Sequence, residues 1–283
     1  MMMPPLFWGF IVSPLWGAMY MISGGVLASL GVPFGYLIEG LAMLAATALI
    51  ARIDAATRRP GMPTLGWRGA APPLIGAALV AGLGAAILGS EIDNIVRDRI
   101  PLLIPAAAPA TPEAGAVARS IVPGPPVFLA LTYGLIVPFS LAVVGYGIVL
   151  RNLLAGLPVW FAMAFGALAT IWWRHEHPAY WLPWVLAAAL GAWVYTRSHS
   201  IWMGVAALLP QHAVIWLTVV GVNPGIPGFD TDPKAIVEFQ PVWFDAIGVL
   251  CLAVGGYLLI RGFTSGPPAL AAPPAAPAPP TAD

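Results

Sequence analysis

The chain contains little charge and almost no cysteine. Asp, Glu, Lys and Arg together make up 8% of its residues, whereas soluble domains carry roughly 25%. Basic and acidic residues are equal in number, so the formal net charge is zero and nothing in the charge balance favours nucleic-acid binding. The single cysteine, Cys251, excludes an internal disulfide and a cysteine zinc cluster. It lies in an apolar run, and we interpret it as a small core residue.

Long apolar runs take the place of charge, and hydrophobic residues make up 59% of the chain. Runs of about 20 such residues are typical of helices that cross a bilayer. The first run has no basic segment before it and continues beyond the length of a signal peptide, so we expect a retained transmembrane helix. The expected spans are 6–30, 33–51, 73–90, 126–150, 155–173, 179–196, 200–221 and 241–261.

The predicted fold is therefore an all-α, polytopic membrane protein with about eight transmembrane helices. The membrane-embedded domain is expected over residues 1–264, and the Pro/Ala-rich tail 265–283 is predicted to be disordered. Four arginines, Arg52, Arg58, Arg59 and Arg68, fall in one short connection. Because cytoplasmic loops carry an excess of basic residues, we expect both termini to be cytoplasmic, in a bacterial inner membrane.

Two segments suggest local structure. The span at 73–90 contains GAALVAGLGAAILG, and its small residues are suited to close helix packing. The outer loop predicted at 91–125 begins with EIDNIVRDRIP. Its apolar residues Ile92, Ile95, Val96 and Ile100 have the spacing of a short amphipathic helix, which we expect to lie on the membrane surface.

Three segments resemble a known family in their order and spacing. Residues 134–151 read GLIVPFSLAVVGYGIVLR, 159–169 read VWFAMAFGALA, and 191–216 read GAWVYTRSHSIWMGVAALLPQHAVIW. Together they resemble the CAAX-protease and bacteriocin-processing (CPBP) family of intramembrane metalloproteases. The resemblance covers 134–216 and implies a CPBP-like helical core. The matching positions outside the catalytic set are Pro138, Gly147, Phe165, Tyr195, Arg197, Ser200 and Trp202.

The catalytic residues of that family are replaced in this chain. The family carries Glu-Glu-x-x-x-Arg, then Phe-x-x-x-His, then a His with Asn or Asp four residues later. Histidine and carboxylate side chains would bind a metal or activate water inside the bilayer. Carried over position by position, these residues fall on Leu141, Ala142, Tyr146, Ala169, Leu208 and His212. The resemblance thus implies the family scaffold without its usual catalytic groups.

A few polar residues remain as candidates for chemistry. Glu39 and His212 both lie within predicted spans and could form a pair, because ionisable residues inside a membrane generally find a partner. Such a pair would either join two helices by a hydrogen bond or form a remnant proton, metal or cofactor site. His212 alone could instead be an axial ligand of a haem or chlorophyll-type pigment. His175 and His177 could bind a metal, but their spacing is weak evidence without a third ligand and a solvated turn explains them better.

Three functions follow from these patterns. The leading one is a non-catalytic CPBP-like structural or assembly subunit, which binds other integral membrane proteins within the lipid bilayer. The second is an active intramembrane protease with a divergent site at Glu39, His212 or the His175–His177 turn. The third is a pigment- or small-molecule-binding membrane protein. The sequence requires no cofactor for the leading function.

Overall fold

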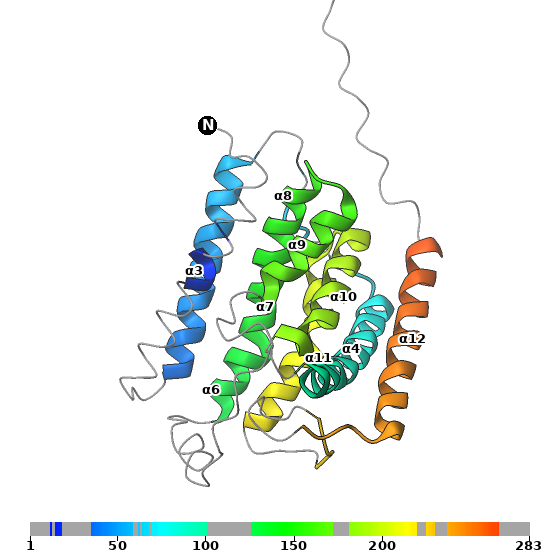
Figure 1. The fold of residues 1–283 in the computed structure, drawn as a ribbon. Coiled ribbons are helices and arrows are strands. Elements are labelled where there is room, and N and C mark those ends of the chain that lie inside the picture. The colour runs from blue at the N-terminus through cyan, green and yellow to red at the C-terminus, as the bar shows by residue number, and fades with distance from the viewer. Residues whose placement is uncertain are drawn as a thin grey trace, which may run out of the picture.

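The computed structural model describes residues 12, 15–18, 35–58, 62, 64–67, 69–100, 126–171, 181–219, 225–229 and 237–265. Within these ranges every regular element is a helix, which confirms the all-α prediction (Figure 1). The described helices are α3 (Gly35–Thr57), α4 (Pro72–Arg99), a continuous helix from Pro126 to Leu154, α9 (Val159–Ile171), α10 (Leu182–Ser198), α11 (Ile201–Val219) and α12 (Val242–Ser265).

Each predicted span from 33–51 onward coincides with one of these helices. Three described helices are long and apolar enough to cross a membrane, namely Pro72–Arg99, Thr132–Leu154 and Val242–Ser265. Val159–Ile171 and Ile201–Val214 are shorter apolar helices. Most of the predicted first span and the tail after Ser265 lie outside the described residues.

Helix α4 packs against α10, α11 and α12, as the neighbouring ribbons of α4 and α12 in Figure 1 illustrate. Its glycines make this possible, because a Cβ added at any of three positions would collide with a neighbouring backbone. Gly82 would meet the Ala207 carbonyl of α11, and Gly84 the Leu252 amide of α12. Gly89 would meet the Pro183 carbonyl of α10. The prediction that this small-residue span packs closely against other helices is confirmed.

Residues 91–99 are helical as expected, but the prediction that they begin an outer loop is wrong. Helix α4 continues without interruption to Arg99. Ile92 and Ile95 point outward, whereas Asp93, Asn94 and Arg97 are buried. Asn94 finds an acceptor in a later part of the chain, and Asp93 and Arg97 pair with each other within α4, as described below.

The helix from Pro126 to Leu154 widens from α-helical to π-helical winding in two places. It consists of α6 (Pro126–Leu131), the π-helical η3 (Thr132–Ile136), α7 (Val137–Leu141), the π-helical η4 (Ala142–Leu150) and α8 (Arg151–Leu154). At the first wide turn, the amide of Val137 donates to the carbonyl of Thr132, five residues earlier. Pro138 follows at once, and local π adjustments of this kind accommodate proline inside a membrane helix.

Candidate functional site

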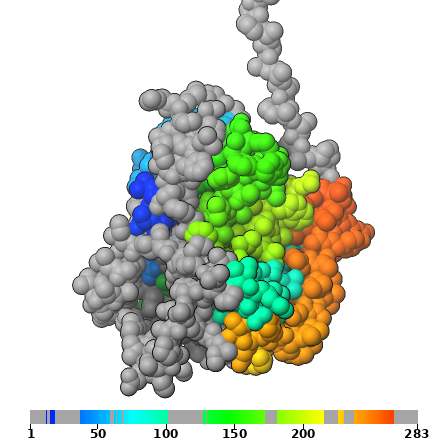
Figure 2. All heavy atoms as spheres, in the orientation of Figure 1, coloured from blue at the N-terminus to red at the C-terminus, as the bar shows by residue number. Residues whose placement is uncertain are grey.

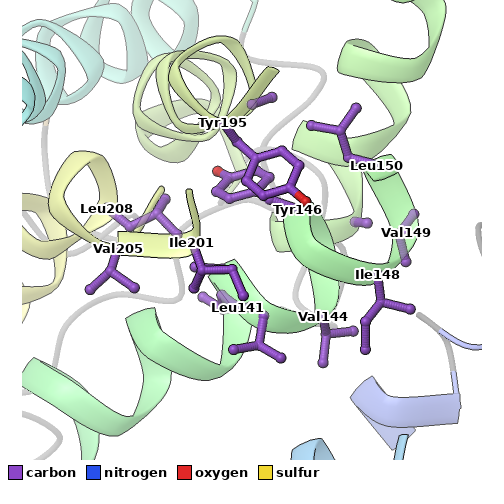
Figure 3. Packing of buried hydrophobic residues seen from close by; sticks show 14 of the residues in the cluster. Leu141, Val144, Tyr146, Ile148, Val149, Leu150, Tyr195, Ile201, Val205 and Leu208 are labelled. Carbon is purple, nitrogen blue, oxygen red and sulfur yellow. The ribbon is translucent and has the colours of Figure 1, made fainter. Parts of the chain in front are cut away.

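The catalytic positions assigned by the family resemblance converge in the interior. Leu141, Ala142, Tyr146, Ala169 and Leu208 lie on α7, η4, α9 and α11, yet all belong to one cluster of buried hydrophobic residues. Figure 3 shows Leu141, Tyr146 and Leu208 pointing into this cluster beside Tyr195 and Ile201. The most exposed of the five, Ala169, keeps only 7% of its surface accessible.

Tyr146 fills the position at which the family would carry its arginine. Its hydroxyl donates a hydrogen bond to the Ala188 carbonyl of α10 at 3.0 Å. Its ring stacks on Tyr195, with centroids 6.3 Å apart. A Cβ at Gly191 would overlap the Tyr146 hydroxyl, and a Cβ at Gly204 would lie 2.6 Å from the ring atom Cδ2. Two glycines, on α10 and α11, therefore provide the space for this side chain.

The five family positions in this cluster carry one polar group, the hydroxyl of Tyr146. Every member of the cluster is hydrophobic, and the one hydroxyl at a family position already donates to a backbone carbonyl. In the part of the chain that the structure describes, no group of three or more His, Cys, Asp or Glu side chains could hold a metal ion. The apolar side chains at Leu141, Ala142, Ala169 and Leu208 offer no metal ligand of their own.

Glu39 and His212 are both buried, and each has a close partner. The Tyr133 hydroxyl donates to Glu39 Oε1 at 3.0 Å. His212 Nδ1 lies 3.0 Å from the Leu208 carbonyl, and its ring meets Trp184 edge-on with centroids 4.8 Å apart. Helices α3 and α11 both pack against η3. The pairing of Glu39 with His212 stays a prediction.

The remaining residues singled out in the sequence are His175, His177 and Cys251. His175 and His177 lie outside the described residues, between α9 and α10. Cys251 is half-buried on α12, so it is less enclosed than a core residue would be.

A buried ionic cluster joins the last turn of α3 to α8. The carboxylate of Asp54 accepts hydrogen bonds from the Arg151 Nη2 and from Asn152 Nδ2, the latter at 3.1 Å. Arg58, one turn after Asp54, reaches the other carboxylate oxygen at 3.2 Å. Asp54 and Arg151 are both nearly inaccessible. Because the partners are far apart in the chain, only the unusual acid within the Arg52–Arg59 stretch could have suggested this cluster.

A second polar cluster lies at the C-terminal end of α4. Asp93 pairs with Arg97 at 3.0 Å. Asn94 donates to the Gly228 carbonyl at 2.8 Å, and Glu91 accepts from the Gln240 amide at 3.0 Å. These contacts fasten segments 225–229 and 237–241 onto α4. Glu91 and Asn94 therefore hold these segments on α4, while Asp93 and Arg97 pair with each other within the helix.

An apolar hollow opens on the outer side of α9 and α10. Its volume is about 430 Å³, and it is lined by Val159, Trp160, Met163, Ala164, Ala167 and Ala189. Trp160 is largely exposed beside it. A surface of this composition accepts hydrocarbon, from lipid or from another helix.

Comparison with protein-family models, with curated proteins and with solved structures finds no match. The fold itself defines the class: its long apolar helices and buried polar fastenings are those of a helical membrane protein.

Proposed function

We propose that this protein is a non-catalytic, CPBP-like integral membrane protein that serves as a structural or assembly subunit of a membrane protein complex. One observation carries the proposal. The positions that would hold the protease's Glu pair, arginine and histidines, taken from three separate segments of sequence, are all buried and all belong to the main apolar cluster. Positions matched by coincidence would be expected on outward faces of the helices as well as on buried ones.

The packing around Tyr146 supports loss of catalysis in particular. A site that had only lost its charged groups would leave a hollow, and buried cavities destabilise a core. Here the ring of Tyr146 fills the space, and Gly191 and Gly204 leave room for it. The packing of η4, α10 and α11 thus accommodates an aromatic side chain at the position where the family carries arginine.

The outer surface supports a role in assembly. Helix α12 forms one edge of the molecule (Figure 2) and exposes many large apolar side chains. Trp243 and Tyr257 are among them, and Trp160 is exposed on α9. In the proposed arrangement about eight helices span a bacterial inner membrane with both termini cytoplasmic. The exposed faces would then contact lipid and the helices of partner proteins.

The test is the mass of the native complex in mild detergent. We expect the protein to migrate in a defined assembly well above the 29.5 kDa of one chain, with other integral membrane proteins copurifying in fixed ratio. A lone chain in several mild detergents, with crosslinking in intact membranes also negative, would contradict the proposal.

The competing functions give different results in the same preparation. Cleavage of a prenylated or leader-peptide substrate, abolished by His212→Ala but not by Trp160→Ala, would indicate an active protease. A visible absorption band would indicate a bound pigment. We expect neither, because the described interior is filled by apolar side chains at the family's catalytic positions.

A further inference from the structure

The ionic cluster around Asp54 contains more positive charge than it neutralises. Two guanidinium groups, from Arg58 and Arg151, share the single carboxylate of Asp54. The third donor to that carboxylate is the neutral amide of Asn152. One positive charge therefore remains in excess, shared between the buried Arg151 and the partly accessible Arg58, and a charge without a counter-charge is costly where water is largely excluded.

The same arginines have unused donors. Arg151 is 4% exposed, and its Nε and Nη1 are buried without a hydrogen-bond partner. Arg58 Nε is likewise buried and unpartnered. Carbonyl groups at helix ends often accept from arginine, but here they do not reach these atoms. Buried donors normally find an acceptor, and the described residues supply none for these three atoms.

The location defines the chemistry of that acceptor. Asp54 lies in the last turns of α3, and Arg151 opens the last turn of the helix that ends at Leu154. In a membrane-spanning bundle the ends of helices lie at the level of the lipid headgroups. Arginine matches phosphate oxygens with two or more parallel hydrogen bonds. Basic pockets between helix ends at this level are suited to phosphate-bearing headgroups.

We propose that Arg151 and Arg58 form a binding site for one phosphate group, carried by an anionic phospholipid or free in solution. The unused donors of both arginines are closed off from solvent, so Arg58, the more accessible of the two arginines, would turn aside to admit the phosphate, which would then accept from both guanidinium groups and balance the excess charge beside Asp54. The side chain of Arg58, 19% accessible, connects the cluster to the surface. This site is independent of the proposed assembly function.

The experiment compares two variants with a matched control. Arg151→Lys keeps a positive charge for Asp54 but removes Nε and Nη1 as donors, and Arg58→Gln leaves the Arg151–Asp54 pair intact. Arg197→Gln is the control, because Arg197 is an exposed arginine at the end of α10 and outside the cluster. Circular dichroism and gel filtration would verify that all three variants are folded.

Native mass spectrometry after reconstitution with phosphatidylglycerol or phosphatidylcholine gives the first readout. We expect preferential retention of one phosphatidylglycerol, reduced about tenfold or more in both cluster variants, because each lost charge-assisted bond is worth that factor. Arg197→Gln should retain it fully. A second readout is thermal stabilisation by inorganic phosphate in chloride-matched buffer.

The two readouts distinguish the sources of phosphate. Selective loss of lipid retention assigns the site to a headgroup. Stabilisation by inorganic phosphate that disappears in Arg151→Lys, without lipid selectivity, assigns it to soluble phosphate. If neither readout separates the cluster variants from Arg197→Gln, the site binds no phosphate and the proposal is overturned.

Discussion

The hydroxyl of Tyr146 occupies the space that a side chain at Gly191 would need. The ring and the glycine lie on different helices, η4 and α10, and the glycine allows the Tyr146 hydroxyl to reach the Ala188 carbonyl one turn away. A relationship of this kind can be tested from both sides.

Gly191→Ala should destabilise the protein by about 1–3 kcal/mol, the usual cost of overpacking a core. The added methyl would collide with an aromatic ring held on several sides. Chemical unfolding in detergent micelles measures the change. Gly76→Ala and Gly256→Ala are matched controls in helices, since a Cβ at either position meets nothing within 4 Å, and their stability should be unchanged or slightly raised.

Combining Gly191→Ala with Tyr146→Leu should restore part of the lost stability, because the smaller side chain vacates the space that the methyl needs. The double-mutant cycle should therefore give a coupling energy of about 1 kcal/mol or more. Simple additivity would show that the two residues do not compete for the same space.

Tyr146→Phe isolates the hydrogen bond from the ring. It removes the donor to the Ala188 carbonyl and should cost about 0.5–1.5 kcal/mol. Tyr257→Phe is the comparison, since Tyr257 is exposed on α12. Equal effects of the two substitutions on the unfolding midpoint would contradict the assigned role of the hydroxyl.

Asp54→Asn should be among the most damaging single changes outside the apolar core. It leaves two arginines without their shared carboxylate, and breaking a buried pair in this way costs about 3–5 kcal/mol. The exposed pair of Asp98 and Arg99 gives the contrast, because Asp98→Asn should cost less than about 1 kcal/mol. Unfolding midpoints, together with expression level in membranes, measure both.

A comparison of Gly228 with Gly225 distinguishes the energetic cost of a positive φ from the cost of steric crowding. Both have positive φ, at 71° and 68°, but only Gly228 is enclosed, with a Cβ there lying 2.5 Å from the Glu238 carbonyl. Gly225→Ala should cost about 1–2 kcal/mol from conformation alone. Gly228→Ala should cost clearly more and should release the fastening on α4, seen as faster hydrogen exchange in 225–229. Similar exchange in both variants would show that crowding at Gly228 is unimportant.

The helices could be predicted because a long apolar run has few alternatives in a bilayer. The close packing of α4 was likewise predictable from its Gly and Ala content. The polar clusters were not, because their partners are distant in sequence: Asn94 meets Gly228, and Asp54 meets Arg151. For the same reason the sequence did not show that the polar side of α4 near Asp93 faces inward. A polar side at a helix end can face water or can face a distant part of the chain, and the sequence does not distinguish the two.

The burial of Leu141, Ala169 and Leu208 in one cluster could not be predicted from composition, since nothing in three separate apolar helices specifies which faces point inward. The accommodation of Tyr146 was beyond prediction for a different reason. Glycines at 191 and 204 are ordinary in membrane helices, and their purpose becomes visible only when the ring lies between them.

The neighbours that α4 packs against, α10, α11 and α12, all follow it in the chain. During synthesis α4 must therefore enter the membrane well before any of these partners exists. Its glycine faces, which leave backbone uncovered, meet only lipid or the insertion machinery until the C-terminal helices arrive. Of these three partners, α12 is the last to be synthesised. A ribosome stalled before Val242 would therefore leave α4 without one of its main partners.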